Sequence, residues 1–157
     1  MNPTDCSNKS AIIQVIGQTI SFFTVIGGWF VVHWLTKKRE KRKEVFEKVE
    51  SFCIYLCDLE KKARNFHLSP SFDGNSAEEI SLEIQRTIAK LNFYPLSLLK
   101  IDNKFFINLR QSITLKNFVK SEFHQIDYFH PILKEISLAI DDLINRLQEE
   151  FIKKFGK

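Results

Sequence analysis

The chain has 157 residues, a formal net charge of +4 at pH 7 and only three cysteines, which are too few for a disulfide framework. The positive charge does not indicate sequence-specific binding of nucleic acid. Six of the seven residues from Lys37 to Lys43 are basic, and the sequence from Glu44 onward is near neutral, so the basic excess predicts a membrane-surface feature.

The segment from Ala11 to Thr36 contains no Asp, Glu, Lys or Arg. As a helix it would be about 39 Å long, which exceeds the about 30 Å of a bilayer's hydrocarbon core. The segment is too long for a signal-peptide core, and its basic cluster follows it instead of preceding it. We therefore predict an extracytoplasmic tail over 1–10, an uncleaved transmembrane helix over 11–36 and a cytoplasmic helical domain over 37–157.

The distribution of Lys and Arg also predicts the orientation. Basic residues are concentrated after the apolar segment, so the positive-inside rule places the amino terminus outside and the carboxyl terminus in the cytoplasm, here of a bacterial inner membrane. The residues expected at the inner boundary are aromatic or basic: Trp29, His33, Trp34, Lys37, Lys38, Arg39, Lys41, Arg42 and Lys43. A ring of His33 side chains in an oligomer is an alternative, as a gate or pH sensor.

Small and polar residues share one face of the predicted span. At 100° per residue they fall within about 80°, with one glutamine at the edge, and large apolar residues occupy the opposite face. Such a face favours contact with another helix in lipid, and with one span per chain that helix belongs to another molecule. The face can line a narrow pore or close into a dry bundle, and such residues are also ordinary in spans. Its residues are Gln14, Gly17, Gln18, Ser21, Thr24 and Gly28.

Apolar residues after the basic cluster recur at helical spacing in four segments, which predicts an all-α body of about four helices continuing from the span. The first segment ends near His67, and the second starts with a Ser76–Glu79 capping box and ends at Pro95. The third segment is capped by Asp102, and its apolar face is expected to include Val119. The last segment runs from Pro131 to near Gly156. The last segment's near-heptad stripe faces its own bundle or a neighbouring copy, and its shortness favours the bundle.

No motif for nucleotide binding, nucleophilic catalysis or zinc proteolysis occurs, so we expect no enzyme, cofactor or metal site. Cys53 and Cys57 fit small buried hydrophobes better than a redox pair. The spacing of His124, Asp127 and His130 resembles a metal triad, but Pro131 disrupts a helix there. Scattered basic residues are explained more simply as solvated than as an anion site; these are Arg64, His67, Arg86, Lys90 and Arg110.

The stretch Ile26–Glu44, with its Trp-Phe-Val-Val-His-Trp run and basic exit, resembles the anchor of small bacterial single-span membrane proteins with a helical cytoplasmic domain. The general plan is similar to membrane effectors of Hailong-type phage-defence systems. The resemblance implies a homo-oligomeric effector that opens an ion-conducting or depolarising path, and a tetramer or larger ring of copies would support such a path. Its partners would be its own copies, membrane lipids and a cytoplasmic regulator or small ligand. The alternative is a membrane-tethered helical adaptor or immunity-type protein.

Overall fold

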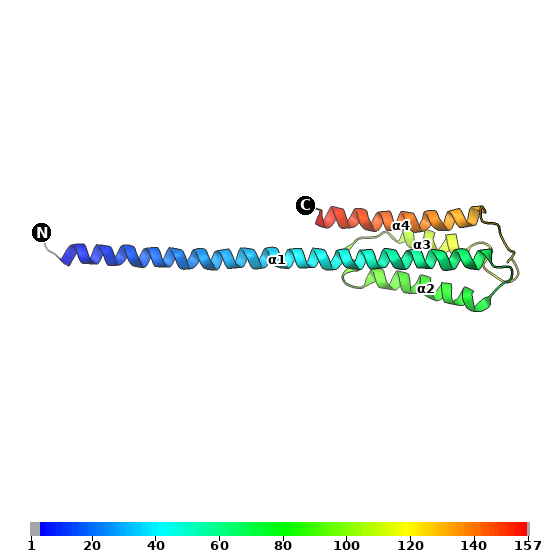
Figure 1. Cartoon of the computed structure of the whole chain (residues 1–157), viewed down its shortest axis with the longest axis horizontal. Helices are drawn as coiled ribbons and strands as arrows, with labels where there is room; N and C mark the ends of the chain where they lie inside the picture. The colour runs from blue at the N-terminus through cyan, green and yellow to red at the C-terminus, as the bar shows by residue number, and fades with distance from the viewer. Residues whose placement is uncertain (1–3, 157) are drawn as a thin grey trace. The chain divides into compact units, whose positions relative to one another are not determined.

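The computed structural model describes residues 4–156, with side chains from Gly17 to Gly156. Over these residues the fold is all-helical and contains no β-strand, as the sequence predicts. Its elements in chain order, shown in Figure 1, are α1 (Thr4–Leu68), α2 (Gly74–Asn92), the 3₁₀ helix η1 (Leu96–Leu98), α3 (Asn103–Thr114) and α4 (Pro131–Phe155). The chain divides into two compact units, Met1–Arg42 and Lys43–Lys157, which are described separately.

The first unit consists of the amino-terminal part of α1. Every described side chain from Gly17 to Arg42 is exposed, including eleven large apolar ones between Ile20 and Leu35. By length and composition α1 is able to cross a membrane: an 18-residue window reaches a mean hydropathy of 1.4, and none of that window is buried within the chain. The prediction of one long apolar helix near the amino terminus is therefore confirmed.

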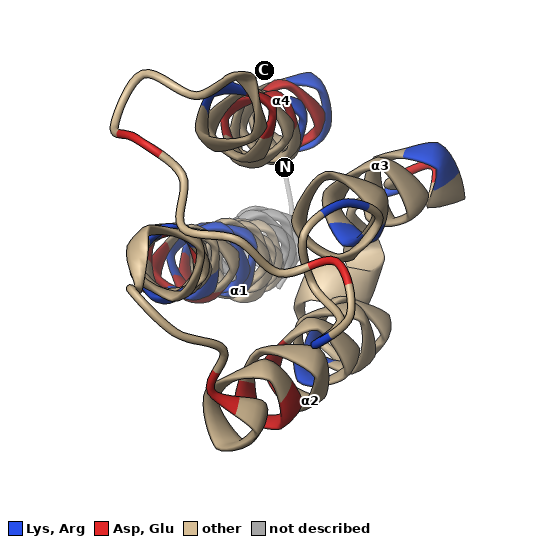
Figure 2. Cartoon of the chain, turned by 90° about the vertical axis from the view of Figure 1, so that its right-hand side faces the viewer, with Lys and Arg blue, Asp and Glu red and all other residues tan. Residues whose placement is uncertain are grey.

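The second unit is a four-helix arrangement in which α1, α2, α3 and α4 follow one another around the bundle (Figure 2). Each helix contributes an apolar stripe at spacings of three and four residues, because only one face of each helix is turned inward. On α1 the stripe runs from Val45 to Phe66, and on α4 from Leu133 to Phe151. The α4 stripe is buried among the unit's own helices, so the prediction that it faces its own bundle is confirmed.

The helix starts in this unit are set by capping side chains. Asp102 caps α3 by accepting a hydrogen bond from the Lys104 amide, as predicted. The predicted capping box at Ser76 is wrong, because the N-cap of α2 lies three residues earlier: Asp73 accepts hydrogen bonds from the Asn75 amide at 3.0 Å and the Ser76 hydroxyl at 2.6 Å.

Two further predictions about burial fail. Val119 lies beyond the end of α3 and is 49% exposed, because the helix stops at Thr114. Cys57 is exposed instead of buried, whereas Cys53, one turn earlier, is half-buried against the core. Burial raises the pKa of the Cys53 thiol, so that cysteine is held in its unreactive protonated form.

Candidate functional site

The predicted small and polar face lies on α1 within the first unit. Gly17, Gln18, Ser21, Thr24 and Gly28 are all exposed there, with large apolar side chains elsewhere around the helix. Gln14 belongs to α1, but its side chain lies outside the described part of the structure. The five described residues therefore form an uncovered surface available to another molecule, and we call it the small-residue face.

The hydroxyl groups of this face bond to their own helix. Ser21 Oγ donates to the Gly17 carbonyl and Thr24 Oγ1 donates to the Ile20 carbonyl, each at 2.9 Å. Such bonds to the carbonyl four residues earlier satisfy a hydroxyl without any neighbouring helix. The amide of Gln18 is consequently the side-chain group of this face that has no hydrogen-bond partner among the described residues, so it is the best candidate for a hydrogen bond between copies or to water.

The glycines of the first unit leave room for close approach. A Cβ atom built on Gly17, Gly27 or Gly28 would meet nothing within 4 Å. In lipid, helices associate largely through such small residues, because they let the backbones pack closely. Gly28 lies on the small-residue face, whereas Gly27 lies 100° around the helix from Gly28 and outside that face.

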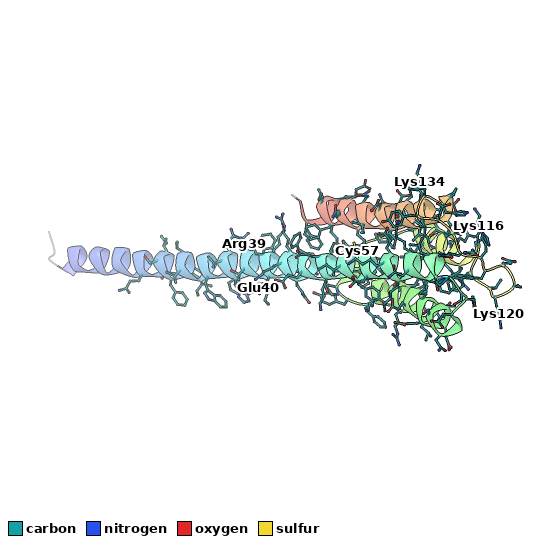
Figure 3. All side chains as sticks on the ribbon, turned by 45° about the vertical axis from the view of Figure 1, so that its right-hand side comes forward. Arg39, Glu40, Cys57, Lys116, Lys120 and Lys134 are labelled. Carbon is teal, nitrogen blue, oxygen red and sulfur yellow. The ribbon has the colours of Figure 1, made fainter. Side chains whose placement is uncertain are left out.

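The aromatic and basic residues that follow form local contacts along α1. The rings of Trp29 and His33 stack with centroids 5.3 Å apart, and Lys38 Nζ lies 5.6 Å from the ring centroid of Trp34. Figure 3 shows Arg39 and Glu40 projecting from the helix. Aromatic rings next to lysines are typical of a membrane interface, where rings and ammonium groups contact headgroups.

The second unit contains a cavity of about 490 Å³ between α1 and the end of α2. Tyr55, Phe93 and Tyr94 contribute aromatic surface to it, and Lys48 and Lys90 contribute ammonium groups. Lys90 Nζ lies 3.5 Å from the Tyr55 ring centroid, which is cation–π geometry. The structure gives neither lysine an ion pair with a described carboxylate, and Asp58, which also lines the cavity, pairs with Lys61 at 3.2 Å. The two lysine charges are therefore available to an anionic ligand.

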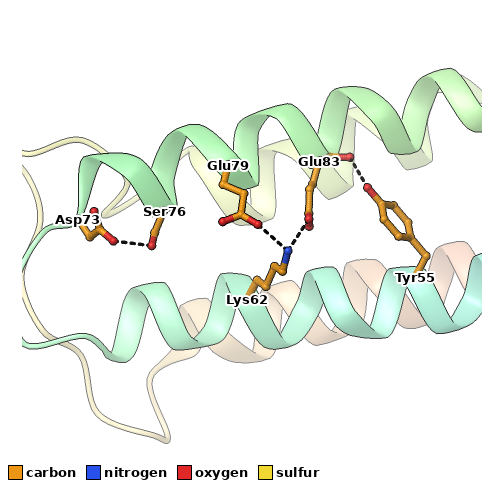
Figure 4. Close-up of polar contacts among 6 residues, drawn as sticks. All are labelled: Tyr55, Lys62, Asp73, Ser76, Glu79 and Glu83. Atoms are coloured by element: carbon orange, nitrogen blue, oxygen red, sulfur yellow. Dashed lines mark hydrogen bonds and ion pairs between the residues drawn. The ribbon is translucent and has the colours of Figure 1, made fainter.

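A polar cluster joins α1 to α2 on the same side of the unit (Figure 4). Lys62 Nζ lies 2.7 Å from Glu79 Oε1 and 2.5 Å from Glu83 Oε1. Hydrogen bonds to Glu79 and then Glu83 raise the pKa of Lys62, so the lysine stays charged. Tyr55 adds a hydrogen bond of 3.3 Å to the Glu83 carbonyl. These four residues stabilise the contact between α1 and α2. The spacing of residues in the sequence did not predict this role.

The three residues spaced like a metal triad each have a local structural role. His124 Nδ1 lies 3.1 Å from the Glu122 carbonyl, Asp127 accepts from the Phe129 amide, and His130 caps α4. Within the described residues no group of three His, Cys, Asp or Glu side chains is placed to hold a metal ion.

The scattered basic residues do not gather on one site either. Arg64 donates to the Ser137 hydroxyl on α4, His67 is buried, and Lys90 lies over Tyr55. Their side chains therefore serve separate contacts.

The small-residue face, the aromatic and basic boundary and the lysine-lined cavity are thus the features that a function must use. No protein-family model, curated protein or solved structure matches the chain.

Proposed function

We propose that the chain is a homo-oligomeric effector of the bacterial inner membrane, a regulated ion channel or depolarising pore that acts in phage defence. In this proposal α1 crosses the bilayer with its amino terminus outside, and the second unit lies in the cytoplasm. Copies associate through the small-residue face in a ring such as a tetramer, and the second unit receives the regulating signal.

The observation that carries the proposal is the exposure of eleven large apolar side chains from Ile20 to Leu35, which are 37–71% exposed. Burying a side chain of this size contributes about 1.5–3 kcal/mol. Eleven of them left in water would forgo more free energy than the about 5–15 kcal/mol by which a typical domain is stable. A lipid bilayer removes that cost, and the basic residues after Thr36 match an anionic inner leaflet.

The Gln18 amide of the small-residue face supports oligomerisation. The Gln18 amide has hydrogen-bonding groups that hydrocarbon cannot satisfy, and copies related by a closed symmetry bring equivalent amides together around one axis. The ring of amides is then a path for ions when the helices separate. The lysine-lined cavity supplies a place where a cytoplasmic ligand shifts the balance between closed and open arrangements.

The oligomeric contact is tested by placing leucine at neighbouring glycines. Gly28→Leu should dissociate the oligomer, because it fills the close approach between copies. Gly27→Leu is the matched control: it adds the same side chain one residue away, and neither position has a neighbour within its own chain. Native mass spectrometry in nanodiscs measures the stoichiometry. A monomeric wild type, or equal behaviour of both variants, would contradict the proposed contact.

Conduction is tested separately in planar bilayers and in cells. Purified protein should give unitary currents under activating conditions, and Gln18→Leu should abolish both the currents and cellular toxicity. Ile20→Leu, on an apolar side of the helix, should preserve them. The pore proposal is refuted if the wild-type protein gives no currents in planar bilayers and the Gln18→Leu variant remains toxic to cells.

The second candidate function is a membrane-tethered adaptor or immunity-type protein. The observation that favours it is the self-satisfied hydroxyls of Ser21 and Thr24, which require no neighbouring helix. Phe93 and Tyr94, 69% and 58% exposed beside the cavity, would then contact a partner protein. Replacing residues 11–36 with an unrelated leucine-rich span discriminates the two functions, because an adaptor keeps its activity and a pore loses it.

A further inference from the structure

A buried histidine lies at the junction of three elements of the second unit. His67, in the last turn of α1, is 0% exposed. Its Nε2 lies 3.2 Å from the Ile113 carbonyl of α3, and its Nδ1 lies 3.5 Å from Asn117 Nδ2 in the connection between α3 and α4. A carbonyl only accepts and an amide nitrogen only donates, so these partners match a neutral imidazole with its proton on Nε2.

Asn117 links His67 to the rest of the connection through its own hydrogen bonds. Its backbone adopts a φ of 56°, in the left-handed region that asparagine tolerates. Its amide holds the backbone of His124 twice: Nδ2 donates to the His124 carbonyl at 3.0 Å, and Oδ1 accepts from the His124 amide at 2.7 Å. These two bonds fix which end of the amide faces His67. The His67 carbonyl also accepts from the Ile126 amide at 3.4 Å.

The surroundings of His67 are apolar on the remaining sides. The Phe66 ring contacts Phe72, Phe118 and Phe123 with centroids 5.1–5.9 Å apart, and Phe118 also lies near His67. This aromatic cluster offers a cation little solvation. We propose that protonation of His67 releases the 115–130 connection from the bundle, so that the connection is an acid-sensitive switch that uncovers the aromatic cluster.

The charged groups around the histidine agree with this role. Burial, the largest cause, and the nearby His130 at the start of α4 lower the pKa of His67, against the opposing hydrogen bonds of the Ile113 and Asn117 backbone. Three charged side chains of the neighbouring elements are engaged elsewhere: Arg64 of α1 with Ser137 of α4, Lys116 of the connection with Glu135 of α4, and Asp127 with the Phe129 amide. Lys120 and Glu122 of the connection are exposed to solvent. No described carboxylate forms an ion pair with His67 that would compensate its charge.

The sign of the effect follows from linkage. Once the connection is released, His67 titrates near the ordinary histidine pKa of about 6.5, above its pKa in the bundle, so the released form binds more protons below that pH. The connection is held in the bundle most strongly above about pH 6.5. As the pH falls from there toward the lower pKa of His67 in the bundle, the equilibrium constant between the bound and the released connection shifts toward release by about tenfold per pH unit. The device resides in the second unit and does not depend on the pore.

Amide hydrogen exchange of the full chain in nanodiscs tests the switch at pH 7.5, 6.5, 5.5 and 4.5. The protection factors of the His124 and Ile126 amides, corrected for intrinsic exchange, should fall about tenfold per pH unit below pH 6.5, while those in the middle of α4 stay constant. His67→Gln keeps a donor for Ile113 and cannot titrate, so it should remove this dependence. His124→Gln and His130→Gln are matched controls that should keep it.

Nuclear magnetic resonance of the wild type gives a second readout in case His67→Gln fails to fold. The titration midpoint of the His67 ring should coincide with the loss of protection in the connection. The inference is overturned if His67 titrates without any change in the connection, or if the pH dependence survives in His67→Gln and disappears in His130→Gln.

Discussion

Lys62 Nζ of α1 lies 2.5 Å from Oε1 of Glu83 on α2, and the Glu83 side chain is only 12% exposed (Figure 4). This ion pair differs from the unit's surface pairs because one of its members is largely removed from water. A carboxylate in that position needs its partner, since an unpaired buried charge costs far more than an exposed one. The α1–α2 contact is therefore partly ionic as well as apolar.

Lys62→Met should lower the urea midpoint of unfolding, because it leaves the Glu83 carboxylate without its cation. Lys61→Met is the matched control: Lys61 pairs with Asp58 at 3.2 Å, but its side chain is 74% exposed. Exposed pairs of this kind contribute about 0–1 kcal/mol. Circular dichroism in urea compares the variants, and equal midpoints would show that the Lys62 cluster does not stabilise the unit.

Leu143→Ala should cost about 2–5 kcal/mol of unfolding free energy, because Leu143 is 0% exposed on the inner stripe of α4 and its truncation leaves a cavity. Leu138→Ala, on the same helix but at a position 52% exposed, should change the stability by less than about 1 kcal/mol. Thermal and urea unfolding measure both. If Leu143→Ala altered the oligomeric state and left stability intact, the stripe would be an intermolecular contact instead.

Tryptophan fluorescence should locate the boundary of the span directly. The chain has two tryptophans, Trp29 and Trp34, and both belong to the proposed inner interface. In vesicles, lipids brominated near the headgroup should quench them more strongly than lipids brominated at the chain ends, since indole rings prefer the interface. Single Trp29→Phe and Trp34→Phe variants assign the two signals. Quenching only from the bilayer centre would place the span in a different register.

Acid should weaken the start of α2 through Asp73. The hydrogen bond from the Ser76 hydroxyl, and then that from the Asn75 amide, lower the pKa of Asp73. The stabilisation is complete above the ordinary carboxyl pKa of about 3.9 and is lost as the pH falls through the lower folded value. Asp73→Ala should reduce the urea midpoint at pH 7, and Asp73→Asn should restore it because asparagine also caps helices. An acid-induced loss that is identical in Asp73→Asn would assign it to other groups.

The sequence predicted the helices where a long apolar period was bounded by a capping residue or proline. Asp102 and Pro131 mark the starts of α3 and α4 in this way. The start of α2 was misplaced because Ser76 and Glu79 imitate a capping box, whereas Glu79 in fact pairs with Lys62 of α1. That choice depends on which helix packs beside α2, and local spacing contains no such information.

The small-residue face could be predicted from spacing alone, because every candidate lies on one helix. The lysine-lined cavity could not, since Lys48 and Lys90 come from different helices. Neither could the role of His67, which depends on Asn117, fifty residues later. Its position on α1 predicted only a helix end. A buried polar pair between residues this far apart in the chain produces no periodic pattern in the sequence.

The left-handed backbone of Asn117 has a consequence for tracing ancestry. Only asparagine, aspartate or glycine readily adopts that conformation, and only an amide holds the His124 backbone at both ends. Distant descendants of the same gene should therefore retain the imidazole–carboxamide pair while their lipid-facing aliphatic residues interchange freely. The pair His67 and Asn117 should therefore identify related proteins more reliably than the apolar segment of α1.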